Sequence, residues 1–279
     1  MSRFSASDAA VEGFRVIRSQ WRLVVGWALF NVLGLVAASV LAAVLIGIAA
    51  VASTTSETAG AVGGAIGGLV LAFAAFAVEV MIVAALFRRL LRDEPPGFLH
   101  LRFGPDELRV AAVWLVMLSA FVAGGLLALY LSSLAGRAGG WRIGVPAIIV
   151  LFGALGWLAL RLSLAAPIAV AERRIGFAAS WRLTKGHTAS LLGMAVLTFC
   201  LLAMIMVLAW LALALISGAA TGWRDLGLLL RTDANAVSER PGFYAVQLLV
   251  QFLFAPVLWV ISQAPLVAAY LGLKDEAQA

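Results

Sequence analysis

The sequence predicts an all-α polytopic membrane protein whose six transmembrane helices form three hairpins, with interfacial helices on the cytoplasmic side. Of its 279 residues, 63% are hydrophobic and 12% are charged, whereas soluble domains average about 45–50% and 25%. Six apolar runs are each long enough, at about 1.5 Å per residue, to cross a hydrocarbon core about 30 Å thick. We therefore expect one integral membrane domain over residues 1–279.

An amphipathic helix is predicted over residues 5–22, directly before the first span. Its bulky apolar residues recur at intervals of three and four and so share one helix face: Val11, Phe14, Ile17 and Trp21. Ser5 is expected to cap this helix through the backbone of Asp8. Three basic residues are predicted to meet lipid headgroups: Arg15, Arg18 and Arg22.

The six spans are predicted at about 23–50, 60–88, 108–134, 145–171, 190–216 and 243–273. Proline and glycine mark the boundaries between them. The Pro-Pro-Gly sequence at 95–97 forbids continued helix after span 2, and the proline followed by two acids at 104–107 suits the first turn of span 3. A glycine-rich loop is expected at 135–144, and the longest connection is expected at 217–241.

Five glycines in span 2 are predicted to pack closely against another helix: Gly60, Gly63, Gly64, Gly67 and Gly68. They form overlapping GxxxG patterns, in which missing side chains let two backbones approach. If this face is packed, Gly64→Leu should lose stability. The alternative is that glycine is simply frequent in membrane helices. The sequence leaves open whether the packing partner is the same chain or a second one.

Five polar residues lie inside predicted spans, where they need a partner or water: Glu79, Arg161, Gln247, Gln251 and Gln263. Counted from the charged span ends, Glu79 and Arg161 lie at a similar depth near the midplane, with Gln263 close in height. We expect Glu79 and Arg161 to pair if spans 2, 4 and 6 adjoin. In the alternative, Arg161 extends to the interface and Glu79 is protonated. Pro256 and Pro265 free backbone groups in span 6 that also need partners.

The segment 172–185 joins spans 4 and 5 and alternates basic with apolar residues. Span 4 is expected to break at Pro167, and a following helix would bring Ile175, Ala179 and Leu183 onto one face. Basic and aromatic residues of this segment are predicted to lie among the headgroups: Arg173, Arg174, Trp181, Arg182 and Lys185. The alternative is a solvated basic loop.

Basic residues predict the orientation of the chain. Of the 20 Lys and Arg residues, 15 belong to the amino-terminal segment, the two even-numbered span exits with their connectors, and the carboxyl tail. The other three loops hold five, so the positive-inside rule places both termini in the cytoplasm. The net charge of +6 therefore reflects orientation, and we expect no nucleic acid as a partner.

The exits of spans 2, 4 and 6 share one pattern of small and apolar residues: 81–85, 167–171 and 265–269. This likeness predicts an internal repeat of three units, each a lead-in on the cytoplasmic side followed by a two-span hairpin.

Three stretches carry a family resemblance: residues 161–167 (Arg-Leu-Ser-Leu-Ala-Ala-Pro), Glu172, and residues 180–186 (Ser-Trp-Arg-Leu-Thr-Lys-Gly). They resemble the signature of the glycerophosphoryl diester phosphodiesterase membrane-domain family and related six-span bacterial inner-membrane proteins of unknown function. The resemblance implies a bacterial inner membrane, and a phosphodiesterase domain follows in some relatives. No such domain follows Leu273, so we do not expect the activity to transfer.

The sequence holds no pattern typical of an active site or a metal site. His100, His187 and Cys200 stand alone, without a paired-cysteine or HExxH motif. Two functions fit: a non-enzymatic membrane module that interacts with lipids, a second copy or a partner membrane protein, and a transporter-like protein for a lipid or small solute. We favour the module, with no cofactor. A cavity reaching Glu79 would favour the transporter.

Overall fold

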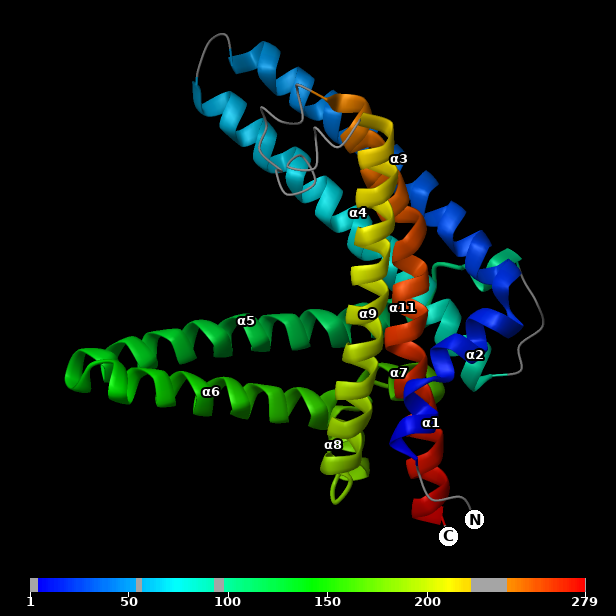
Figure 1. Ribbon diagram of the computed structural model, residues 1–279, viewed down its shortest axis with the longest axis vertical. Helices are drawn as coiled ribbons and strands as arrows, with labels where there is room; N and C mark the ends of the chain where they lie inside the picture. The colour runs from blue at the N-terminus through cyan, green and yellow to red at the C-terminus, as the bar shows by residue number, and fades with distance from the viewer. Residues whose placement is uncertain (1–4, 54–56, 93–97, 222–239, 279) are drawn as a thin grey trace. The chain divides into compact units, whose positions relative to one another are not determined.

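The computed structural model describes residues 5–53, 57–92, 98–221 and 240–278, and every element in these ranges is helical (Figure 1). Six helical stretches are long and apolar enough to cross a membrane: Trp21–Val51, Ala61–Leu91, Pro105–Arg137, Trp141–Ala171, Thr188–Ile216 and Pro241–Gln278. The all-α fold with six candidate spans is thereby confirmed, and the chain is a multi-pass membrane protein. The sequence at 95–97 and most of the connection at 217–241 lie outside the described residues.

The chain divides into two compact units. The first unit holds residues 1–12, 83–196 and 263–279, and the second unit holds residues 13–82 and 197–262. Three of the long helices contribute residues to both units: α4 (Glu57–Leu91), α9 (Thr188–Thr221) and α11 (Pro241–Gln278).

The amino-terminal segment forms two short helices that lead into the first span: α1 (Ala6–Ala10), α2 (Glu12–Ser19) and α3 (Trp21–Ser53). The backbone N–H of Asp8 donates to Ser5 Oγ at 3.3 Å, which confirms the predicted cap. The expected single helix is wrong, because α1 ends before α2 begins. Small Gly13 is buried in α2, whereas bulky Val11 and Trp21 are exposed.

In the second unit, α4 packs against α3 through glycine (Figure 1). A Cβ added at Gly63 would collide with Ala49, and one added at Gly67 would lie 2.7 Å from Ile46 Cγ1. Both glycines therefore allow the two backbones to approach, as the GxxxG pattern predicts. The partner helix at these two positions belongs to the same chain.

Gly64 and Gly68 differ from their neighbours. A Cβ at either position would meet no atom within 4 Å in the part of the chain that the structure describes. Gly64→Leu therefore has no packing to lose within this chain, and packing of these two residues against a second chain stays a prediction. The surroundings of Gly60 lie outside the described residues.

A proline in α11 leaves a carbonyl that a distant side chain satisfies. Pro256 has no N–H to donate to the carbonyl of Phe252, four residues earlier. The buried Asn31 of α3 donates to that oxygen instead, at 2.7 Å. The expectation that freed backbone groups need neighbouring protein is confirmed here. Nearby, the backbone of α2 approaches α11 so closely that a Cβ on Gly13 would lie 2.5 Å from Ile261 Cα.

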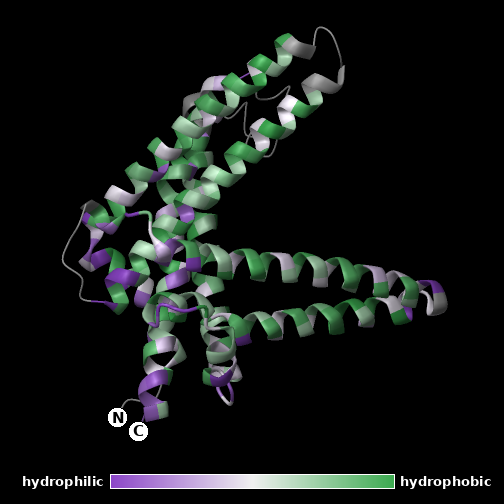
Figure 2. Cartoon of the chain, turned by 180° about the vertical axis from the view of Figure 1, so that it is seen from behind, coloured by the Kyte–Doolittle hydropathy of each residue, from purple (hydrophilic) through white to green (hydrophobic). Residues whose placement is uncertain are grey.

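In the first unit, α5 (Pro105–Gly139) and α6 (Trp141–Leu162) lie side by side (Figures 1 and 2). Pro105 opens α5, as the sequence predicts. The two helices are joined by Gly140 alone, whose φ of +65° is a conformation that glycine adopts readily. The predicted loop at 135–144 is therefore wrong, because one glycine makes the whole turn and both helices continue to it. Figure 2 shows hydrophobic residues along both helices and hydrophilic residues at the turn.

Span 4 is interrupted where the sequence predicts a break. α6 ends at Leu162, and a second segment, α7 (Ala165–Ala171), completes the span. The ring of Pro167 clashes with a helical carbonyl four residues earlier, which is that of Ser163. The break lies at this residue and Leu164.

The connection after α7 contains one short helix, α8 (Phe177–Leu183). Ile175 precedes it and is exposed, so the predicted face that included Ile175 is wrong at that residue. Ala179 and Leu183 do share a side, and both pack against the core of the first unit. The alternative of a solvated loop does not apply to the helical part.

The three span exits that look alike in sequence are deeply buried. Most side chains of residues 83–87, 164–170 and 264–273 are at most a few per cent exposed. Ile168 of α7 packs with Tyr270 of α11 and Leu191 of α9 in one cluster. The exits thus form the core of the first unit, while the internal repeat itself stays a prediction.

Candidate functional site

Eight residues were predicted to meet headgroups, and all are exposed: Arg15, Arg18, Arg22, Arg173, Arg174, Trp181, Arg182 and Lys185. Among the polar residues predicted inside spans, Gln251 is exposed, whereas Glu79, Gln247 and Gln263 are half-buried. The Oε1 atom of Gln247 is buried without a hydrogen-bond partner among the described residues.

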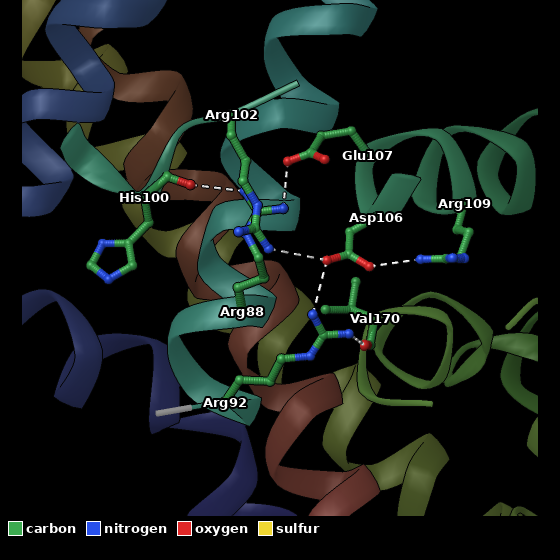
Figure 3. A network of polar contacts seen from close by, with 8 residues as sticks. All are labelled: Arg88, Arg92, His100, Arg102, Asp106, Glu107, Arg109 and Val170. Carbon is green, nitrogen blue, oxygen red and sulfur yellow. Dashed lines mark hydrogen bonds and ion pairs between the residues drawn. The ribbon is translucent and has the colours of Figure 1, made fainter. Parts of the chain in front are cut away.

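Six charged side chains of the first unit form what we call the ion-pair cluster (Figure 3): Arg88, Arg92, Arg102, Asp106, Glu107 and Arg109. Arg88 donates to Glu107. Three guanidinium groups surround the carboxylate of Asp106, at these N to O distances: Arg92 at 2.9 Å, Arg109 at 2.8 Å and Arg102 at 3.5 Å.

Two backbone carbonyls extend the ion-pair cluster. Arg88 donates to the carbonyl of His100 at 2.8 Å, and Arg92 donates to the carbonyl of Val170. Val170 lies in α7, so the cluster links the end of α4 and the start of α5 to the exit of span 4 (Figure 3).

Burial and helix geometry explain how charges are held in this place. The side chains of Arg88 and Glu107 are each 1% exposed, so neither charge has water as an alternative partner. Asp106 and Glu107 lie in the first turn of α5, where unpaired N–H groups favour negative charge. Each of the two carboxylates is therefore paired with at least one arginine, as a buried ion requires.

The ion-pair cluster was not predicted as a site, although the sequence carries a signal for it. Basic residues end span 2 and acidic residues begin span 3, across a short connector. Such complementary span ends indicate a contact. Guanidinium groups do not exchange protons in catalysis, and both carboxylates are bound by arginines, so the cluster is suited to holding helix ends together.

Arg161, in the last turn of α6, lies between two tryptophans. Its Cζ is 5.2 Å from the ring centroid of Trp157 and 5.1 Å from that of Trp181. The two rings meet edge to face with their centroids 5.3 Å apart. Arg161 also donates to the carbonyl of Trp181 at 3.3 Å. Tryptophan faces attract a cation, so this arrangement supplies Arg161 with partners that the sequence did not predict.

The same turn of α6 is bonded to α8. Ser180 Oγ donates to the carbonyl of Arg161 at 2.8 Å. Thr184 Oγ1 lies 3.3 Å from the same oxygen, and its shorter contact is to the carbonyl of Ser180 at 2.9 Å. Both hydroxyl residues are buried. Arg161 and α8 must therefore lie at the same depth. The prediction that α8 lies among the headgroups is therefore incompatible with the prediction that Arg161 lies near the midplane.

The predicted pairing of Glu79 with Arg161 joins residues of different units and stays a prediction. If Arg161 lies at the interface beside α8, the alternative in which it extends toward the headgroups gains support. Glu79 then needs another partner or water.

A cavity of about 300 Å³ lies beside α7, α8 and the end of α11, and we call it the basic pocket. Its charged lining residues are Glu172, Arg174, Arg182 and Lys274. Its walls include the apolar side chains of Ile168 and Leu183, and Tyr270 also lines it. The pocket combines excess positive charge with an apolar wall.

Two other cavities are apolar. One lies along α5 and α6 near their turn, beside Leu131 and Pro146, and the other lies between α3 and α4, beside Ala38 and Phe73. None of the three cavities is lined by Glu79. These three cavities therefore do not provide the cavity at Glu79 that would favour a transporter.

Within the described ranges, no group of three His, Cys, Asp or Glu side chains lies close enough together to hold a metal ion. Comparison with known proteins adds no homologue to this description. No family model, no curated protein and no solved structure matches the chain.

Proposed function

We propose that this chain is a non-enzymatic module of the bacterial inner membrane that interacts with membrane lipids or partner membrane subunits. The observation that carries the proposal is the exposed basic and aromatic segment 172–185 directly beyond the buried exit of span 4. Basic residues attract anionic headgroups, and exposed tryptophan suits the interface.

The long exposed apolar helices support the same proposal. Large apolar side chains are exposed along α5 and α6, among them Leu126, Tyr130 and Ile149. Such surfaces require lipid tails or another membrane protein against them. Both carboxylates of the ion-pair cluster are buried and paired with arginines, so we assign the cluster a structural role.

We also propose kinship with the glycerophosphoryl diester phosphodiesterase membrane-domain family. Its signature residues have a common structural purpose here, which supports the resemblance. Ser180 donates to the Arg161 carbonyl, Thr184 lies beside it, and Trp181 covers the Arg161 side chain. The stretch at 180–186 and the stretch at 161–167 thus form one joint between α6 and α8.

The orientation that we propose places both termini in the cytoplasm, and reporter fusions test it. Fusions at Pro96 and Gly186 should report the cytoplasm, and fusions at Glu57, Gly139 and Asn235 should report the periplasm, because 15 of 20 basic residues lie on the first side. Pro96 and Asn235 lie outside the described residues. A cytoplasmic signal at Glu57 would overturn this orientation.

Native mass spectrometry of the purified chain tests the module itself. We expect phospholipid adducts, or adducts of a second membrane subunit, that survive removal of the detergent. The matched experiment for the transporter is solute or lipid flux into vesicles that contain the protein. Flux above that of protein-free vesicles, without retained lipid or subunit, would contradict the module and favour the transporter.

A further inference from the structure

We propose that the basic pocket binds the phosphate of an anionic phospholipid headgroup. This inference rests on the proposed function, since it assumes that the module interacts with lipid. It adds a defined site, a chemical class of ligand, and two residues of α11, Tyr270 and Lys274, that the sequence did not single out.

Two cations in the pocket are available to an anion. Arg182 of α8 and Lys274 of α11 line the same cavity from different helices. Neither forms an ion pair within the part of the chain that the structure describes. The one acidic side chain, Glu172, is held by Arg174 at 2.7 Å, so its charge is already compensated. An anion that enters the pocket therefore meets net positive charge.

A buried hydroxyl supplies the second, independent observation. Tyr270 is 2% exposed, and its Oη is buried without a hydrogen-bond partner among the described residues. A buried hydroxyl without a partner is unfavourable. The Nζ of Lys274 lies 5.6 Å from the ring centroid of the same tyrosine. Tyr270 lines the pocket, and a phosphate whose entry uncovers this hydroxyl would accept its hydrogen.

The surroundings of the pocket favour a lipid over a soluble phosphate. Ile168 and Leu183 form an apolar wall, which suits the glycerol and acyl part of a phospholipid. Residues on both sides of Ala171 and Leu273, where the apolar runs of spans 4 and 6 end, line the pocket. Headgroups lie at this level of a bilayer.

The test uses the full chain in nanodiscs of phosphatidylcholine mixed with phosphatidylglycerol. Native mass spectrometry reports the ratio of the two lipids that the released protein retains. We expect the wild type to enrich phosphatidylglycerol. Arg182→Gln and Lys274→Gln should each reduce that enrichment about fivefold, the effect of one basic residue near an anionic surface. Tyr270→Phe should reduce it as well while keeping the ring in place.

Arg137→Gln is the matched control, because it removes an exposed charge from the last turn of α5 without touching the pocket. It should leave the enrichment unchanged. Arg182 and Lys274 are both exposed, so their variants should unfold at the wild-type temperature. That measurement separates loss of binding from loss of structure.

Each remaining outcome overturns a different statement. A wild type that retains neither lipid nor a partner subunit contradicts the proposed function itself. Two results contradict only the assignment of the pocket as the binding site. One is retention of both lipids in the ratio of the nanodisc, and the other is the same enrichment in all four variants. If inorganic phosphate in the buffer displaces phosphatidylglycerol, the site takes phosphate from solution and the lipid assignment is wrong.

Discussion

Arg88→Gln is expected to lower the free energy of unfolding by about 3–5 kcal/mol, because it leaves the carboxylate of Glu107 buried without its partner. Both side chains are 1% exposed, so water cannot replace the lost guanidinium without rearrangement of the first unit. The substitution also removes the donor to the carbonyl of His100. Thermal unfolding in detergent, followed by circular dichroism, measures the loss.

Two further variants test whether the loss of stability comes from breaking the buried pair or from removing any positive charge. Arg89→Gln makes the same change one residue along, at a half-buried position, and should cost far less. The double variant Arg88→Met, Glu107→Leu removes both charges and should lose less stability than the two single changes together. Equal losses for Arg88→Gln and Arg89→Gln would show that the pair contributes nothing specific.

Gly13→Ala is expected to destabilise the second unit by about 1–3 kcal/mol, the usual cost of forcing extra volume into a packed site. The new Cβ would lie 2.5 Å from Ile261 Cα and 3.1 Å from the carbonyl oxygen of Val260. Both are backbone atoms, so no side chain can turn away to make room. The higher helix propensity of alanine returns about 1 kcal/mol at most.

Gly64→Ala is the matched control for Gly13→Ala. It makes the same change inside a helix where the added Cβ would meet no described atom within 4 Å. We expect it to be neutral or slightly stabilising in the same unfolding measurement. If the two alanine variants melt together, α2 does not pack against α11 at Gly13.

Hydropathy predicts the spans well because lipid imposes a minimum apolar length. Span 2 was expected at 60–88, and α4 covers Glu57–Leu91. Hydropathy does not report where a helix continues beyond the apolar run. The expected ends are therefore too early: α9 extends to Thr221, past the expected end at 216, and α5 extends to Gly139.

Side-chain partners were harder to predict because they join segments far apart in the chain. The sequence places arginines at the end of span 2, but nothing local shows that Arg92 reaches Val170, 78 residues later. The expected depth of Arg161 stays a prediction for a related reason. Counting 1.5 Å per residue from Arg161 assumes a straight helix, whereas the chain breaks before Pro167 and brings α8 back beside Arg161.

The bond from Asn31 to the carbonyl of Phe252 has a consequence for biosynthesis. Its two ends are 221 residues apart, which at a synthesis rate of about 5–20 residues per second separates their appearance by roughly 10–45 s. During that interval the first span lies in the bilayer with an amide that lacks its final acceptor. Gly13 likewise reaches its contact with Ile261 only after Ile261 has been synthesised. Asn31 and Gly13 thus reach these native contacts only after residues 252 and 261 have been synthesised.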